Sequence, residues 1–348
     1  MTRHRSGFWA GLACALGFAL LPHAALAAAK PFQVYMVLYR GITEAEKGFM
    51  DYFKSNHIPV QFTVRDCAED KTRLPGFVGE IKRLRPDLVY TFGTTVTAAI
   101  AGKSGEKGRG GRIADIPVVF DIVADPVGAG LVSSLVGSGR NLTGGSHLVP
   151  LENQLQALAS VTSIGSLAMV YNPSEQNSLL TVQALKALAG KYRYRFTLYP
   201  ILVGAGGSPD GQALAGVMAR VAADKPHVLY LPSDSFIISQ AAAVTQLAHQ
   251  AGILTFSATE APVRHSGALM GLVSSYYNVG QFAAYKAEQI LVNKIPPGRI
   301  PIETLNRFSF LLNMKEARAL HFYPPISVFK FAEVIDDEPL LSQAQTPQ

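Results

Sequence analysis

Short apolar strands alternate with amphipathic helices along this chain from Lys30 onward, and that alternation restricts its fold more than any other feature. Runs of roughly four to eight aliphatic and aromatic residues are typical of strands buried inside a sheet. When helices fall between such strands, the strands pair in parallel and are joined by right-handed crossovers. The predicted strands are Phe32–Leu38, Val60–Val64, Leu88–Phe92, Val118–Phe120, Leu167–Val170, Phe196–Leu202, Val228–Leu231, Ile253–Phe256 and Leu269–Val273.

Apolar side chains at helical spacing predict three of the intervening helices and part of the core. A polar stretch at Val161–Gly165 separates a helix from the next strand and indicates a domain boundary there. The apolar stripes, which we interpret as ordinary core packing, are Leu151, Leu155 and Leu158; Ile237, Ala241, Val244 and Ala248, in a helix that begins near Phe236; and Val279, Ala283, Ala287 and Ile290.

The N-terminus has the composition of a secretory signal peptide. Arg3, His4 and Arg5 precede an apolar run from Gly7 to Leu21, and Ala25–Ala29 offers two A-x-A cleavage sites. We therefore expect residues 1–29 to be removed on export to the periplasm. No later segment supplies the roughly 20 apolar residues of a transmembrane anchor, so the mature chain is expected not to span a membrane.

Cysteine and charge narrow the class of protein further. Cys14 lies in the signal segment without the preceding residues of a lipoprotein site, so Cys67 is the one mature cysteine and no internal disulfide is expected. The mature chain of about 320 residues is longer than a single core usually supports, which predicts two lobes. The formal charge of +6 falls to +4 without Arg3 and Arg5, a balance too mild to indicate nucleic-acid binding.

Two glycine-rich loops interrupt the alternation. The loop Gly102–Arg112 is basic but lacks the G-x-x-x-x-G-K-[ST] spacing of a phosphate-binding loop. We interpret it, and the similar segment Gly204–Gly211, as surface connections.

The stretch Ile116–Val149 has the pattern of a ligand-facing sheet edge. A buried strand ends at Asp121, and Asp125 precedes Pro126, which suits the first turn of a helix. A helix start there would present free N–H groups and a positive end to an anion. Capping of that helix is an equally good interpretation of Asp125.

Polar residues follow four other predicted strands, where open α/β sheets bind ligands. Each of them alone could be a helix cap, and only their recurrence favours a binding site. Tyr276 and Tyr277 follow the last strand and could add an aromatic wall or simply pack. The polar residues are Tyr39 and Arg40; Thr91, Thr94 and Thr95; Asn172, Ser174 and Glu175; and Ser233, Asp234 and Ser235.

Patterns that indicate catalysis are weak. The histidines are dispersed without metal-ligand spacing, so no metal ion and no cofactor are expected. Ser146 does not lie in a G-x-S-x-G elbow, although a triad of Ser146, a distant histidine and Asp121 stays open as a minor alternative. We expect a protein that is not an enzyme.

Several segments, in this order, resemble one known family. They are ADPVGAGLV within Ile116–Val132, NLTGGSHLVPLENQLQ at Asn141–Gln156, VYNPSEQN at Val170–Asn177, LYLPSDS at Leu229–Ser235, and Gly267–Tyr277 followed by Gly280. Together they resemble the ABC-transporter substrate-binding proteins of the tryptophan/tyrosine-type uptake group, which have the type I periplasmic-binding-protein fold. The resemblance covers essentially the whole mature chain.

The resemblance implies an α/β fold of two Rossmann-like lobes with parallel sheets, joined by a three-stranded hinge. Lobe 1 is expected at residues 30–162 and 274–303, and lobe 2 at 163–273 and 304–348. One small molecule would be enclosed between the lobes and delivered to a membrane permease.

The resemblance also implies roles for individual residues. Thr94 and Thr95 would bind a ligand carboxylate, Asp234 an ammonium group, and Asn172 and Glu175 would line the second lobe. Asp121 departs from the family, which usually has a small residue there, so it could change the ligand class. The complete candidate ligand-binding set is Tyr39, Thr94, Thr95, Asp121, Asn172, Glu175, Asp234 and Tyr276.

The leading hypothesis is a periplasmic binding protein for a small polar ligand, an amino acid or a related compound, that closes by hinge motion. A ligand-sensing subunit of a membrane receptor or kinase is the alternative with the same fold. An exported hydrolase is the third hypothesis, motivated by Ser146, Asp121 and the histidines.

Overall fold

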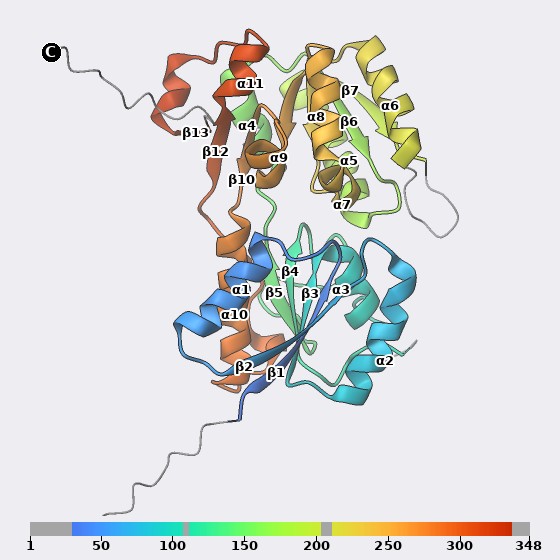
Figure 1. Cartoon of the computed structure of the whole chain (residues 1–348), viewed down its shortest axis with the longest axis vertical. Helices are drawn as coiled ribbons and strands as arrows, with labels where there is room; N and C mark the ends of the chain where they lie inside the picture. The colour runs from blue at the N-terminus through green and yellow to red at the C-terminus, as the bar shows by residue number, and fades with distance from the viewer. Residues whose placement is uncertain (1–29, 107–110, 203–210, 336–348) are drawn as a thin grey trace, which may run out of the picture. The chain divides into compact units, whose positions relative to one another are not determined.

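The computed structural model describes residues 30–106, 111–202 and 211–335. The predicted signal peptide and parts of both glycine-rich loops lie outside these residues. Two sheets organise the rest of the chain (Figure 1).

The first sheet has the order β11-β5-β4-β3-β1-β2, and all its pairings are parallel. Its central strands are continuous apolar runs because helices cover both faces. The strands are β1 (Phe32–Leu38), β2 (Val60–Asp66), β3 (Leu88–Phe92), β4 (Val118–Val123), β5 (Leu142–Ser146) and β11 (Glu303–Thr304). The helices of this part are α1 (Glu44–Ser55), η1 (Lys71–Arg73), α2 (Leu74–Leu84), α3 (Gly93–Ala101), α10 (Tyr276–Leu291) and η2 (Pro297–Arg299).

The second sheet has the order β13-β12-β10-β9-β8-β6-β7, in which only the β10–β12 pairing is antiparallel. Its strands are β6 (Ser166–Tyr171), β7 (Arg195–Pro200), β8 (Val228–Leu231), β9 (Leu254–Ser257), β10 (Met270–Val273), β12 (Ser309–Asn313) and β13 (Ala332–Ile335). Its helices are α4 (Leu151–Val161), α5 (Gln176–Tyr192), α6 (Gly211–Asp224), α7 (Ser235–Ser239), α8 (Ala241–Gln250), α9 (Glu260–His265), α11 (Met314–Ala319) and η3 (Ile326–Lys330).

Three segments carry the chain between the two sheets. They are residues 147–150 between β5 and α4, residues 274–275 between β10 and α10, and residues 305–308 between β11 and β12. This arrangement confirms the predicted fold of two α/β lobes with a hinge of three crossings. The exact lobe boundaries stay a prediction, and α4 packs in the second core although it precedes residue 162.

Helices α1 and α10 lie side by side against the first sheet (Figure 1). They pack closely because glycines leave room at the contact: a Cβ at Gly280 would lie 1.9 Å from the Ala45 carbonyl oxygen, and one at Gly48 would lie 2.1 Å from the Tyr277 carbonyl oxygen. Thr43 and Glu46 fix the start of α1 with a capping box. The tight contact holds Tyr276, the first residue of α10, in a defined position.

Several local predictions need correction. Residues 125–130 form hydrogen-bonded turns and not a helix; the Asp125 carboxylate accepts the Gly128 N–H at 2.8 Å, which stabilises a turn instead. The helix expected to begin near Phe236 is interrupted at Gln240, which separates α7 from α8. Its predicted core residues are nevertheless all buried.

Candidate functional site

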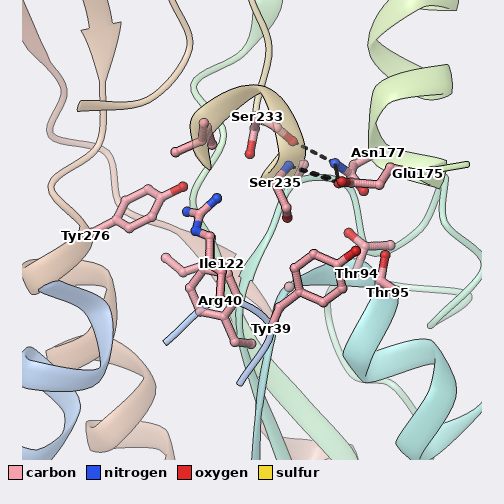
Figure 2. Close-up of a pocket in the computed structure, with 14 residues that line it drawn as sticks. Tyr39, Arg40, Thr94, Thr95, Ile122, Glu175, Asn177, Ser233, Ser235 and Tyr276 are labelled. Atoms are coloured by element: carbon pink, nitrogen blue, oxygen red, sulfur yellow. Dashed lines mark hydrogen bonds between the residues drawn. The ribbon is translucent and has the colours of Figure 1, made fainter. Parts of the chain in front are cut away.

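A cavity lies where the strand ends of the two sheets face each other. Figure 2 shows the side chains that surround it. The lining residues are Tyr39, Arg40, Phe92, Gly93, Thr94, Thr95, Ile122, Ala124, Glu175, Asn177, Ser233, Ser235, Ile238 and Tyr276.

Five of the eight predicted site residues line this cavity. They are Tyr39 after β1, Thr94 and Thr95 in the first turn of α3, Glu175 before α5, and Tyr276 at the start of α10. They come from both sheets, as expected from the position of strand ends in α/β folds.

Asp121 does not line the cavity. The Asp121 side chain is fully buried. One of its carboxylate oxygens accepts the N–H of the next residue, Ile122, at 2.9 Å, and the other accepts a hydrogen bond from the Tyr90 hydroxyl at 3.3 Å. Tyr90 also donates to Glu46, at 2.9 Å. Burial, and then the Glu46 carboxylate, raise the pKa of Asp121 well above its usual value. Its expected ligand-facing position was therefore wrong.

Asp121 instead supports a strained part of the cavity wall. Ile122 has φ +54°, a left-handed conformation that a β-branched residue rarely adopts, and the β4–β5 register shifts at this point. The hydrogen bond from Ile122 N–H to Asp121 helps to hold this conformation. The strain places Ile122 against the cavity, beside Gly93.

Asp234 and Asn172 lie behind the cavity in the second lobe. Asp234 accepts hydrogen bonds from Ile237 N–H at 3.0 Å, Asn172 N–H at 2.8 Å and the Ser178 hydroxyl at 2.6 Å. Asp234 thus caps helix α7. Helix capping was the alternative to ligand binding for each polar residue that follows a predicted strand. Burial, and then the nearby Glu175 carboxylate, raise the pKa of Asp234. Neither residue is among those that line the cavity.

Glu175 is the acidic side chain that faces the cavity. It is 1% exposed, and its two oxygens accept the Ser235 N–H at 3.2 and 3.1 Å. Asn177 Nδ2 donates to it at 3.1 Å (Figure 2). Glu175 also contributes, after burial itself, to the raised pKa of the adjacent Tyr39. This carboxylate is held in place and is positioned to attract a cation.

The first turn of α3 offers the opposite charge. The helix begins at Gly93, which has φ +76°, and its N-cap residue Phe92 supplies no side-chain hydrogen bond to the free N–H groups. Such a helix start carries a partial positive charge. Thr94 and Thr95 add hydroxyl groups on the same side of the cavity (Figure 2). An anionic group is favoured there.

Arg40 also lines the cavity, although it was not in the candidate ligand-binding set. Its guanidinium lies 5.2 Å from the centre of the Phe92 ring, at the other side of the cavity from Thr94 and Thr95 (Figure 2). Its position directly after β1, next to Tyr39, was the pattern that could have identified it. Ser233 and Ser235 were identified as strand-end residues but left out of the candidate set, because short polar residues near helix starts are typical caps. Asn177, in the first turn of α5, was missed.

Tyr276 and His147 meet beside Arg40. Their rings are in edge-to-face contact, with centroids 5.5 Å apart. His147 Nε2 and the Ser233 hydroxyl are 2.9 Å apart, and burial lowers the pKa of His147 to about 3. The Tyr276 hydroxyl is buried and has no hydrogen-bond partner among the described residues.

The hydrolase hypothesis finds little support in this geometry. The Ser146 hydroxyl donates to the Ala124 carbonyl oxygen at 3.0 Å, and its neighbour His147 contacts Ser233 instead. A histidine with a pKa near 3 is a weak base at neutral pH. Among residues 30–106, 111–202 and 211–335, no cluster of three or more His, Cys, Asp or Glu side chains could hold a metal ion.

No helix within residues 30–106, 111–202 and 211–335 has both the length and the apolar character needed to cross a membrane.

The free Cys67 is buried, and its thiol contacts the Tyr39 carbonyl oxygen at 3.7 Å. Cys67 thus packs directly behind a residue of the cavity wall.

Comparisons with known proteins agree with the fold. A family model described as ABC transporter substrate binding protein matches residues 36–334. A tyrosine-binding protein of Clostridioides difficile is 27% identical over 292 residues, which are 82% of this chain and 79% of that protein.

Solved structures show the same fold. A conserved domain protein from Vibrio cholerae has a TM-score of 0.78 and 23% identity, and the match covers 88% of this chain and 99% of that one. A domain from Streptococcus pneumoniae in complex with L-Trp has a TM-score of 0.76 and 22% identity, with coverage of 87% and 100%.

Proposed function

This chain belongs to the ABC transporter substrate-binding protein family, and we propose that within it the chain captures an amino acid between its two lobes. The observation that supports the ligand class most is the pair of opposite charges in one cavity. Glu175 is a fixed carboxylate, and the α3 N-terminus with Thr94 and Thr95 is an anion site. A zwitterionic α-amino acid carries both matching charges.

The proposed arrangement gives Glu175 the role that was expected for Asp234. The ligand ammonium group would bind Glu175, because Glu175 lines the cavity and Asp234 does not, although both carboxylates accept hydrogen bonds from the protein. The α-carboxylate would accept N–H groups of the first turn of α3. The names of the relatives, a tyrosine-binding protein and a domain crystallised with L-Trp, support the same ligand class.

We place the protein in the periplasm as the partner of a membrane permease. The N-terminal composition of residues 1–29 supports export, and membership of the family supports a role in uptake. Closure of the lobes around the ligand by hinge motion at the three crossings would form the surface that the permease recognises. We propose no bond chemistry.

A thermal-shift screen of residues 30–348 against amino acids, amines, sugars and nucleosides tests this function. A ligand at 100 times its dissociation constant stabilises the folded state by roughly 2.7 kcal/mol. At least one amino acid should raise the melting temperature, and the corresponding amine without a carboxylate should not. A shift with sugars alone would contradict the proposal.

A further inference from the structure

The cavity has two polar ends, and the amino-acid proposal uses only one of them. The head end consists of Thr94, Thr95 and Glu175. The tail end consists of Arg40, Ser233 and Tyr276, and Figure 2 shows the Arg40 guanidinium and the Tyr276 ring on the side away from Thr94 and Thr95.

Arg40 brings a positive charge to the tail end, and no other side chain that lines this end of the cavity carries a negative one. The ion pairs of the described residues do not include Arg40. Glu69 is a carboxylate that feels the charge of Arg40: burial raises the pKa of Glu69, and Arg40 lowers it. Glu69 does not line the cavity. A partly buried guanidinium is stabilised by a partner that accepts its hydrogen bonds.

Tyr276 supplies a second group in need of a partner. It is 5% exposed, and Arg40 and Ser233 are the polar side chains that act on its hydroxyl, although neither meets it in hydrogen-bond geometry. The nearest carboxylate, Glu260, accepts the Tyr276 backbone N–H at 2.7 Å and is not among the residues that line the cavity. Ser233, which does line it, contacts His147, and burial lowers the pKa of His147 to about 3. A buried hydroxyl without a partner in the protein is well placed to donate to a ligand.

The geometry points to a ligand with a second anionic group, and we infer that the substrate is an amino acid whose side chain ends in a carboxylate. This inference rests on the proposed function. The head end would bind the α-amino and α-carboxylate groups, while Arg40 and Tyr276 would donate to the side-chain carboxylate. A guanidinium matches a carboxylate with two parallel hydrogen bonds, which a neutral aromatic side chain cannot accept.

The net charge of the cavity agrees with this ligand class. Arg40 and the helix end contribute about +1.5, and Glu175 contributes −1. A ligand with one ammonium and two carboxylates has a net charge of −1 and leaves none of these groups unpaired. A neutral amino acid would leave the guanidinium without a partner.

Isothermal titration with pairs of isosteric ligands tests the inference on the unmodified protein. The pairs are L-glutamate with L-glutamine and L-aspartate with L-asparagine; L-2-aminoadipate, L-tyrosine and L-tryptophan complete the panel. The best dicarboxylic amino acid should bind about 100-fold more tightly than its amide or either aromatic. Tighter binding of a neutral amino acid would overturn the inference but support the proposed function, whereas no binding by any amino acid would refute both.

Single substitutions test whether Arg40 and Tyr276 bind the side-chain carboxylate. Arg40→Gln should weaken dicarboxylate binding about 100-fold and leave binding of the neutral amide within about threefold, and Tyr276→Phe should weaken dicarboxylate binding about fivefold. The matched control is Arg73→Gln, since Arg73 also lies over an aromatic ring, Phe77 at 5.8 Å, but on the surface. Equal losses for neutral and acidic ligands in Arg40→Gln would show that Arg40 binds the α-carboxylate and would overturn the inference.

Discussion

Asp121 in the first lobe and Asp234 in the second occupy similar places in the sequence but very different environments. Each follows an apolar run in the sequence and each is fully buried, although Asp121 lies inside β4 and Asp234 lies after β8. Asp234 is surrounded by three hydrogen-bond donors, whereas Asp121 has one N–H donor and shares the Tyr90 hydroxyl with Glu46. Burial and a nearby carboxylate raise the pKa of both acids, so the comparison shows that the number of hydrogen-bond donors decides how much a buried acid contributes to the fold.

The largest expected effect on stability is that of Asp234→Ala. The substitution leaves two N–H groups and a hydroxyl without their acceptor and removes the cap of α7, so the free energy of unfolding should fall by about 4 kcal/mol. Urea unfolding measures this. Asp70→Ala is the control, because Asp70 caps η1 at the surface and should cost about 1 kcal/mol. Equal costs would contradict the account of Asp234.

His147, in the first crossing between the lobes, should make the protein less stable in acid. Burial lowers its pKa from 6.5 to about 3, so between these pH values the unfolded chain binds a proton that the folded state does not. This contribution is fully present above pH 6.5 and is lost as the pH falls, by up to about 1.4 kcal/mol per pH unit. The unfolding free energy of His147→Gln should therefore fall less steeply than that of the natural protein between pH 6.5 and 4.5. Parallel pH profiles would refute this.

Asp121→Asn should have the opposite pH dependence. Burial and Glu46 raise the pKa of Asp121, so the folded state holds a proton more tightly than the unfolded chain, and stability is lost as the pH rises above the ordinary value of 3.8. Asparagine keeps the acceptor for Ile122 N–H without a charge. We expect a gain of about 1 kcal/mol at pH 7.5 and little change at pH 4, measured by urea unfolding.

The control for that variant is Asp115→Asn. Asp115 is exposed, and its ion pair with Arg85 lowers its pKa, so its removal should not stabilise the protein at neutral pH. A loss of stability in Asp121→Asn at pH 7.5 would show that the carboxylate is needed in its charged form.

The smallest expected effect is that of Asp121→Asn on ligand affinity. Because Asp121 lies behind the wall that Ile122 forms, the dissociation constant should change by less than about threefold. Isothermal titration with the ligand found in the screen measures it. A tenfold change in the dissociation constant would show that Asp121 contacts the ligand after all.

The sequence was sufficient to predict the two lobes and most of their strands, because continuous apolar runs between helices restrict the fold strongly. Strand β5 was missed, since its sequence LTGGS lacks such a run. Its glycines are required by packing: a Cβ at Gly144 would lie 2.2 Å from the Phe120 carbonyl oxygen. The short strands β11, β12 and β13 were missed as well.

The site was predicted less completely than the fold. Strand-end position correctly selected Thr94, Thr95 and Glu175 as residues near the cavity, but the pattern could not distinguish Glu175 from Asp234. Which acid faces the ligand depends on side-chain orientation and on the donors that the neighbouring helices supply. The register shift at Ile122, which turns Asp121 away, has no counterpart in the sequence pattern.

The central claim, that Glu175 in the cavity wall binds the ammonium group of an amino acid, can be tested by one titration series. The natural protein and Glu175→Gln would each be titrated with the best amino acid and with the same molecule lacking its α-amino group. We predict that the natural protein prefers the amine about 100-fold and that the variant loses this preference. Equal affinity of the natural protein for both molecules would contradict the account.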